Sequence, residues 1–434
     1  MPLLSIIITV YNLEKYIGEC LDSVLDQDLA EYEIVLVNNA STDSSGEICE
    51  RYAQKYDKIR YICLEAPSVL GRAHRVGFKE AKGVYCQFID GDDYVAKGCY
   101  SDIFKTFNEK IPDLIFGSFE CKPEKGARYL RDAEVDPKCV NDQPYRRAVA
   151  YISKLPNFHG MSWRYIFKKS LFAKNSPLGV TKKKTKDGVG TDELFVINLF
   201  TRAKSIYYYN KPFYMYRMRS DQALTNTITN EHFKGYFLNI IYMLNEIKKD
   251  SILNGFIYSR IKIMMKLFAA GCDCLTSNEL SELAKTVEES KKFRSLKAIS
   301  KPNDLYDFIS RYGAEVGLKL YCTYEAAQTV AIVKGFNKTD IYVFPTGNSG
   351  ENTARRLQNE GINVCGFFDN SQHKNGSIIT DISCSLPTVV KEFTPEKINN
   401  SLVVIATVYE NLSSILKKQL LDLGFPEKQI IIKK

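Results

Sequence analysis

The chain lacks any run of about 18 uncharged apolar residues, the length that an α-helix needs to cross a membrane. Its N-terminus, Met1 to Ser5, also lacks the basic segment that begins a secretory signal peptide. It contains no internal repeat or low-complexity tract, and its hydrophobic content of 45% is ample for buried cores. These absences predict a globular, cytoplasmic protein of two or three domains in 434 residues.

A disulfide framework is also missing. The 12 cysteines are scattered without regular spacing, in a chain too long to need covalent cross-links. Cys272 and Cys274 are one residue apart but have no second cysteine pair nearby, which argues against a zinc site. We therefore expect reduced thiols and no structural zinc.

The positive charge is not gathered into a nucleic-acid recognition motif, although the net charge is +8. We expect no nucleic-acid partner, and the charge instead fits an anionic substrate or membrane surface. Peripheral membrane contact would use basic residues and the amphipathic segment from Phe237 to Ile247. The basic run from Lys182 to Lys186 is either a solvated loop or a site that attracts an anionic glycan or lipid diphosphate.

The first 95 residues alternate between strand-like and helix-like patterns. The apolar, β-branched runs predict strands at residues 4–10, 33–38, 59–62 and 84–89, with amphipathic helices between them. We expect Asn12 to cap the first of these helices. Such alternation is typical of a mainly parallel sheet that binds ligands at the carboxyl ends of its strands. Polar residues follow three of these strands, at Tyr11-Asn12, Asn38-Asn39 and Asp90-Gly91-Asp92.

Three carboxylates fall within four residues at Asp90-Gly91-Asp92-Asp93. Like charges this close repel one another unless a cation or water screens them. A hard divalent ion prefers carboxylate oxygens together with the oxygens of a diphosphate, so the cluster is a candidate metal-diphosphate site. The alternative is a solvated Asp/Gly turn.

The remaining sequence divides into further segments. A strand is predicted at residues 113–117, and a helical segment rich in Leu, Ile, Met and Lys follows between about 228 and 325. A new α/β pattern begins at Asp340, with strands at 341–344, 364–369 and 402–406. We therefore predict an N-terminal domain over 1–227, a helical extension over 228–330 and a small α/β domain over 331–434.

The ordered motifs of the N-terminal part resemble family 2 glycosyltransferases of the GT-A fold. The resemblance rests on the segments 5–12, 21–27, 37–43 and 88–93, and on 190–195 and 214–220 further along. It implies an α/β fold with a GT-A type, mainly parallel sheet flanked by helices. It also implies transfer of a sugar from a nucleotide-diphosphate sugar to a hydroxyl of a glycan or glycolipid acceptor, with inversion. The pathway we expect is synthesis of a bacterial-type surface polysaccharide, capsule or lipooligosaccharide.

The resemblance also implies roles for the acidic residues. Asp92 would bind Mn²⁺ or Mg²⁺, and Asp90 would contact the donor ribose or reach the metal through water. Asp93 is expected to be structural. Asp192 would act as the general base on the acceptor hydroxyl, with Glu193 as the alternative base. Asp192 also suits the start of a helix, where it would serve as a cap.

Further positions would bind the two substrates. The donor residues implied are Thr9, Tyr11, Asn39, His74, Arg75, Arg217 and Arg219, and the acceptor residues are Trp163 and Tyr165. The chain departs from the family at Asn39-Ala40, where Asp-Gly is usual, and at His74-Arg75, where Arg-Asn is usual. These departures leave open a nucleotide-sugar-binding protein without transferase activity.

The C-terminal pattern resembles small Rossmann-like domains that bind nucleotide sugars. Gly347 to Gly350 opens a predicted helix, and Asp369 ends a predicted strand. Two interpretations stay open, a ligand-binding domain and a scaffold that supports folding or a homo-oligomer.

Overall fold

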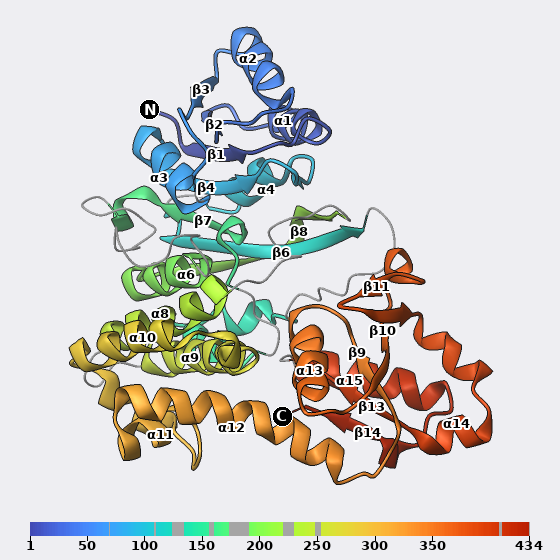
Figure 1. Ribbon diagram of the computed structural model, residues 1–434. Coiled ribbons are helices and arrows are strands. Elements are labelled where there is room, and N and C mark those ends of the chain that lie inside the picture. Colours follow the sequence, from blue (N-terminus) through green and yellow to red (C-terminus); the bar gives the residue numbers. More distant parts are fainter. Residues whose placement is uncertain are drawn as a thin grey trace. The chain divides into compact units, whose positions relative to one another are not determined.

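The computed structural model describes the whole chain except residues 69, 108–109, 124–133, 156–159, 173–190, 220–229, 248–252, 408–409 and 434. The chain forms two compact units, each with its own sheet (Figure 1). The first unit comprises Met1–Lys122, Leu130–Arg217 and Glu246–Arg260, and the second comprises Pro123–Tyr129, Met218–Asn245 and Ile261–Lys434. None of the described helices is long and apolar enough to cross a membrane. The domain boundaries at 227 and 330 stay predictions.

The first unit contains an eight-stranded sheet in the order β3-β2-β1-β4-β7-β6-β8-β5. Its strands are β1 (Leu4–Val10), β2 (Tyr32–Asn38), β3 (Ile59–Cys63), β4 (Tyr85–Asp90), β5 (Tyr94–Val95), β6 (Leu114–Pro123), β7 (Tyr165–Lys168) and β8 (Ile206–Met218). β1 to β4 pair in parallel, whereas β7 pairs antiparallel with both β4 and β6. This mixed α/β architecture confirms the predicted fold class.

Helices cover both faces of the parallel strands. The α-helices of this unit are α1 (Ile17–Leu25), α2 (Ser45–Lys55), α3 (Leu70–Glu80), α4 (Cys99–Lys105), α5 (Tyr145–Ile152) and α6 (Thr191–Arg202). Ile6 and Ile8 join a buried cluster with α1, while Ile7, on the opposite face, meets α3. A Cβ on Gly77 would lie 2.3 Å from the Ile7 side chain, so glycine lets α3 approach β1 closely.

The start of α1 differs from the prediction. The helix begins at Ile17 with Tyr16 in the capping position, so the predicted cap at Asn12 is wrong. Asn12 instead adopts a φ of 53°, and its side-chain oxygen accepts a hydrogen bond from the Thr42 backbone N–H at 2.8 Å. Asparagine tolerates this left-handed backbone better than most residues. The contact ties the loop after β1 to the loop after β2.

The helical segment of the chain is formed by α8 (Asn230–Glu246), α9 (Leu253–Ala269), α10 (Ser277–Glu289), α11 (Leu305–Tyr312) and α12 (Ala314–Lys334). Most apolar residues of the segment that we considered for membrane contact are buried, among them Phe237, which packs on Phe268 of α9, whereas Leu238 and Ile241 are half-buried. Peripheral membrane contact through this segment stays a prediction. α9 is shared by the two units, because the division of the chain falls after Arg260.

The second unit also contains a six-stranded sheet, in the order β11-β12-β10-β9-β13-β14. Its strands are β9 (Asp340–Phe344), β10 (Val364–Phe368), β11 (Ile378–Ile379), β12 (Ile382–Ser385), β13 (Ser401–Ile405) and β14 (Ile430–Ile432), and its helices are α13 (Asn348–Asn359), α14 (Pro395–Asn400) and α15 (Glu410–Asp422). All strand pairs are parallel except β11 with β12. One face packs on α12 and α13, and the other packs on α15. This is the predicted small Rossmann-like domain.

Candidate active site

The carboxyl edge of the first sheet gathers residues from three neighbouring strands. Thr9 of β1 pairs in register with Asp90 of β4, and the backbone N–H of Asn39 donates to Val10 at 2.8 Å. Gly91 turns the chain back against β1, where its N–H donates to the Thr9 carbonyl at 3.0 Å. A Cβ at this position would lie 2.8 Å from the same carbonyl, so a side chain would push the acidic loop away. The predicted strand-end residues therefore share one edge.

The carboxylates of Asp92 and Asp192 act electrostatically on Asp90 at this edge. Burial raises the pKa of Asp90 well above its ordinary value, and the carboxylates of Asp92 and Asp192 raise it further. Asp192 is about 100 residues away in the chain, so α6 carries it to the acidic loop. Such mutual repulsion is the electrostatic condition that a bound cation relieves.

Asp93 has a structural role instead. It is buried, and its carboxylate accepts hydrogen bonds from the Tyr214 hydroxyl and the Arg217 backbone N–H, both at 2.7 Å. The Tyr214 hydroxyl also accepts a hydrogen bond of 3.2 Å from the backbone N–H of Asp90. Residues in the last part of β8 therefore hold the acidic loop in place through these hydrogen bonds.

The oxygen atoms of these carboxylates are of the type that binds a divalent cation, but the described side chains do not form a complete coordination shell. In the part of the chain that the structure describes, no three His, Cys, Asp or Glu side chains are arranged as a metal-binding group. Asp90 and Asp92 carry hard carboxylate oxygens of the kind that such an ion prefers, and repulsion from Asp92 raises the pKa of Asp90. Two carboxylates plus the phosphates of a substrate are the usual way in which Mg²⁺-type ions bind. Metal dependence therefore belongs to the proposal below.

Asp192 lies in the first turn of α6 and is held on one side only. Burial raises the pKa of Asp192 to about 6, and the Glu193 carboxylate contributes in the same direction. Hydrogen bonds from the side chain and backbone of Ser162 lower this pKa but do not offset the effect of burial. Its Oδ1 atom is buried and has no hydrogen-bond partner among the described residues. A carboxylate with one engaged and one unsatisfied oxygen is suited to accept a proton from a ligand.

Glu193, the alternative base, is occupied by an ion pair. The Arg260 Nε atom donates to Glu193 Oε2 at 2.7 Å, and a second guanidinium nitrogen donates to Oε1. A two-pronged pair of this kind leaves the carboxylate little capacity to act as a base. The geometry therefore favours Asp192 over Glu193.

Asn39 uses its side chain within the protein. Its amide nitrogen donates to the Ser68 carbonyl at 2.6 Å, and its amide oxygen accepts from the Ser68 N–H at 3.0 Å and hydroxyl at 2.7 Å. The next residue, Ala40, has a φ of 58°, a left-handed value that favours glycine. Tyr11 at the end of β1 is 47% exposed, whereas Thr9 is buried. An aromatic ring is thus presented at the edge, while Asn39 fixes the loop beside it.

His74 and Arg75 lie on α3 and differ in exposure. His74 is buried, its ring centroid lies 4.3 Å from that of Phe88, and burial lowers its pKa to about 3. A neutral, buried imidazole offers no surface to a ligand, so its predicted donor contact lacks structural support. Arg75 is half-buried, and its role at the donor stays a prediction.

Arg217 braces the acidic loop instead of facing open solvent. Its Nε atom donates to the Asp92 carbonyl at 2.8 Å, and its Nη2 atom donates to Glu19 at 2.6 Å. The guanidinium carbon also lies 5.2 Å from the ring centroid of Tyr16 and 5.1 Å from that of Tyr94. These contacts fix the backbone of a proposed metal ligand. Arg219 follows the end of β8, and its predicted donor contact stays a prediction.

The two aromatic residues predicted for the acceptor are in the core. Trp163 is 3% exposed and stacks on Tyr214, with ring centroids 4.2 Å apart and an 8° angle between the planes. Tyr165 is fully buried in β7. Trp163 thus supports Tyr214, which holds Asp93 and Asp90. Direct acceptor contact stays a prediction without structural support, and the basic run Lys182–Lys186 lies outside the described residues.

The carboxyl edge of the second sheet carries a closed polar cluster. Asp369 follows β10 and accepts hydrogen bonds from the Thr346 hydroxyl and, at 2.9 Å, from the Ser371 N–H. Lys374 pairs with Asp369 at 3.3 Å and donates to the Thr346 hydroxyl at 2.6 Å. The strand-end aspartate is therefore neutralised within the protein.

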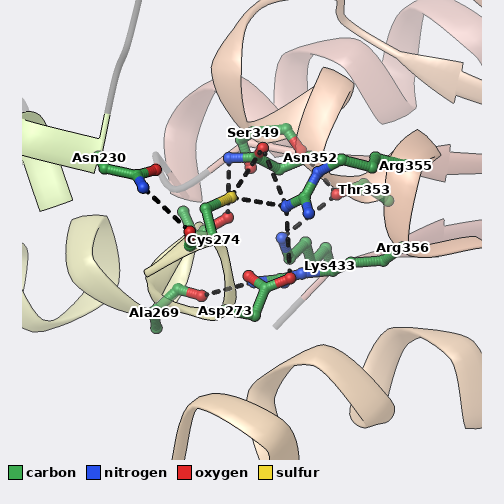
Figure 2. A network of polar contacts seen from close by, with 11 residues as sticks. Asn230, Ala269, Asp273, Cys274, Ser349, Asn352, Thr353, Arg355, Arg356 and Lys433 are labelled. Carbon is green, nitrogen blue, oxygen red and sulfur yellow. Dashed lines mark hydrogen bonds and ion pairs between the residues drawn. The ribbon is translucent and has the colours of Figure 1, made fainter. Parts of the chain in front are cut away.

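A second polar network lies inside this unit (Figure 2). Asp273 pairs with Arg356 and, at 3.3 Å, with Arg355, both of α13. Arg356 also donates to the Ala269 carbonyl at 3.1 Å, and Lys433 donates to the Thr353 hydroxyl at 3.2 Å. These contacts join the end of α9 and the turn after it to α13 and the C-terminal end of the chain.

The fold and the acidic edge together define the GT-A class of protein, as the sequence predicted. A sequence model of "Glycosyl transferase family 2" matches residues 5–174. This part of the chain is therefore similar to glycosyl transferase family 2.

Relatives extend the similarity. The uncharacterized glycosyltransferase EpsJ of Bacillus subtilis is 31% identical over 217 residues, which are 50% of this chain and 61% of EpsJ. A poly(ribitol-phosphate) beta-glucosyltransferase of Bacillus spizizenii is 26% identical over 365 residues, 81% of this chain and 53% of that protein. The chain thus spans little more than half the length of these two relatives.

A solved structure is similar in fold. Residues 1–349 of Staphylococcus aureus TarS, in complex with UDP-GlcNAc, superpose with a TM-score of 0.55 and 21% identity. The match covers 77% of this chain and 92% of the TarS chain. It supports the GT-A fold and, at this identity, the fold alone.

Proposed function

We propose that the protein is an inverting glycosyltransferase that moves a sugar from a nucleotide-diphosphate sugar to a hydroxyl of a glycan acceptor. One observation carries the proposal. Asp192, about 100 residues further along the chain, acts electrostatically on Asp90 of the acidic loop, beside Asp92, at the carboxyl edge of the sheet. Repulsion among them gives a reason to bind a cation, and the unsatisfied Asp192 oxygen gives a reason to accept a proton.

The acidic loop would serve the leaving group. Asp92 and Asp90 would hold Mn²⁺ or Mg²⁺ against the donor diphosphate, and the ion would neutralise the charge that develops on the departing nucleotide. Arg217 would hold the Asp92 backbone in place through its hydrogen bond to the Asp92 carbonyl. The hydrogen bond from the Tyr214 hydroxyl to Asp93 would fix the next residue of the same loop. Arg75, half-buried on α3, would add a positive charge on the donor side.

Asp192 would serve the acceptor. Its Oδ1 atom would take the proton from the attacking hydroxyl while its other contacts to Ser162 hold the carboxylate in orientation. A single base on the acceptor side, with no second carboxylate available from Glu193, suits direct displacement and hence inversion. The exposed ring of Tyr11 would stack on the nucleobase, and the loop that Asn39 fixes through Ser68 would line the same pocket.

The names of the similar proteins guide the choice of substrates. TarS binds UDP-GlcNAc in its structure, so a UDP-sugar is the first donor to test. The Bacillus spizizenii relative acts on poly(ribitol phosphate), an anionic polymer, and the net charge of +8 on this chain suits such an acceptor. We therefore propose a bacterial-type surface polymer as the product, with a phosphate-containing acceptor favoured over the capsule or lipooligosaccharide expected from the sequence. We place the reaction in the cytoplasm, at the inner face of the membrane.

A nucleotide-sugar-binding protein without transferase activity is the alternative. Asn39 and His74 raised it, because both depart from the family pattern. However, their contacts are internal to the fold, whereas Asp192 keeps a buried, unsatisfied oxygen that binding alone does not need. The alternative is therefore disfavoured.

Nucleotide release distinguishes the two. We would incubate the protein with UDP-, GDP- and CDP-sugars, with and without Mn²⁺, and measure the nucleoside diphosphate released. If nucleotide is released from one class of donor, if this release needs Mn²⁺, and if Asp192→Asn abolishes it, the result supports the transferase. Thermal stabilisation by a donor without any release, in the presence of teichoic acid or another glycan acceptor, would favour the binding protein.

A further inference from the structure

The contact between α6 and the helical segment lies directly beside the proposed base. α9 begins at Leu253, outside the N-terminal domain predicted from the sequence, yet its first part belongs to the same compact unit as α6. Phe256 of α9 stacks on Phe200 of α6, with ring centroids 4.5 Å apart and a 24° angle between the planes. One turn further along α9, Arg260 reaches Glu193. α9 thus packs along the face of α6 that begins at the residue after Asp192.

The pair between Arg260 and Glu193 is shielded from solvent. The Arg260 side chain is 5% exposed and the Glu193 side chain 14%. Gly160 completes the enclosure, because a Cβ on it would lie 2.6 Å from Glu193 Oε1. Two residues after Gly160, Ser162 donates its hydrogen bonds to Asp192. The same short segment therefore leaves room for Glu193 and orients Asp192.

We infer that Arg260 is a positioning residue for sugar transfer, which neutralises and immobilises Glu193 so that Asp192 is the one reactive carboxylate on the acceptor side. The inference rests on the proposed function. Without Arg260, Glu193 would be a partly buried and unpaired negative charge next to Asp192. That charge would repel the Asp192 carboxylate and would draw protons or waters that Asp192 needs. The helical segment would then contribute to catalysis through charge balance rather than through contact with a substrate.

The test compares single and double variants of the full chain. Arg260→Met should lower kcat for nucleotide release by about tenfold or more, with the donor Kd changed by less than about twofold. Arg260→Met combined with Glu193→Gln removes both charges and should restore kcat to within about threefold of the wild type. Arg260→Lys keeps the charge but not the two-pronged contact, so an intermediate loss is expected. Lys262→Met, an exposed position on the same helix, is the control and should behave as the wild type.

The double variant decides the case if Arg260→Met folds poorly, which removal of one partner of a buried pair can cause. A well-folded double variant that is as slow as Arg260→Met, or slower than Arg260→Lys, would overturn the inference. The charge of Glu193 would then not be the cause of the loss. An unchanged kcat in folded Arg260→Met would overturn it as well. If the wild type itself releases no nucleotide from any donor, the proposed function fails and the inference fails with it.

Discussion

An aspartate stands at the end of a buried parallel strand in both units, and the two sites differ in their charge balance. Asp90 in the first unit is surrounded by Asp92 and Asp192, which raise its pKa. Asp369 in the second unit is matched by Lys374 and accepts a hydrogen bond from Thr346. The first edge therefore gathers carboxylates that repel one another, whereas the aspartate of the second edge is paired with a lysine.

The comparison shows that topology provides a place for a ligand and that charge balance decides whether the place needs one. Parallel sheets of this type put loops at their carboxyl edges whatever the function. A carboxylate group that repels its neighbours stores free energy which a cation can release, whereas a neutralised cluster gains little. We accordingly assign chemistry to the first edge and interpret the second as a scaffold, one of the two interpretations open from the sequence.

The largest expected effect is that of Asp92→Asn. Nucleotide release should fall about a thousandfold or more, because the proposed metal loses a charged ligand. The melting temperature in chelator should rise at the same time, since Asp92 raises the pKa of both Asp90 and Asp93 through repulsion. Release assays and thermal denaturation in EDTA measure the two effects. Release that stays near the wild-type rate would contradict the metal assignment.

Asp192→Asn should have the next largest effect. Turnover should fall by about a hundredfold or more while donor binding is kept, because the general base acts only on the acceptor side. Asp142→Asn, an exposed position in the same unit, is the matched control. Kinetics with calorimetry of donor binding would separate the two steps. If Asp192→Asn loses donor binding in proportion to turnover, the residue is a donor contact and not the base.

In the second unit, we expect a buried titratable group to affect the free energy of unfolding rather than turnover. Burial, reinforced by Arg356, lowers the pKa of Lys433 to about 7. Between pH 7 and the ordinary lysine pKa of about 10.4, the unfolded chain holds a proton that the folded chain lacks. The free energy of unfolding of this unit should therefore rise with pH in that window, by at most about 1.4 kcal/mol per pH unit.

Lys433→Met should remove this pH dependence and stabilise the unit below pH 7, where the wild type holds a buried charge. Chemical denaturation at a series of pH values measures the slope. Lys428→Met, at an exposed position nearby, should keep the wild-type slope. An identical slope in wild type and Lys433→Met would show that Lys433 is not buried as a neutral amine.

Asp369→Asn is expected to have the smallest effect on turnover, less than about twofold, because the Asp369 carboxylate already forms an ion pair with Lys374. It is the counterpart of Asp92→Asn at the same position of the other sheet. A large loss of turnover would mean that the second edge takes part in the reaction.

The sequence predicted the first edge well for a physical reason. Strand ends, glycine turns and acidic loops are local patterns, so the strands β1 to β4 and the acidic cluster could be located from periodicity and composition. The resemblance added Asp192, which no local pattern connects to Asp90. The antiparallel strands beyond β4 were largely missed, because their pairing depends on contacts between residues distant in the chain.

The supporting residues were missed for the same reason. Tyr214, Ser162 and Arg260 act through contacts that span long stretches of sequence, such as Tyr214 with Asp93. Trp163 and His74 were predicted to contact ligands because the family resemblance places such positions near the acceptor and the donor. Burial, which one sequence does not reveal, places both in the core. The pattern thus finds residue types at an edge, and packing decides which of them face a ligand.

The central claim is that the first edge binds the donor through a metal and that the second edge does not. Isothermal titration with the donor that the wild type turns over, in Mn²⁺ and then in EDTA, tests it most directly. We predict Mn²⁺-dependent binding by the wild type and by Asp369→Asn, and none detectable by Asp92→Asn. Equal donor affinity in Asp92→Asn and wild type, with or without EDTA, would contradict the account.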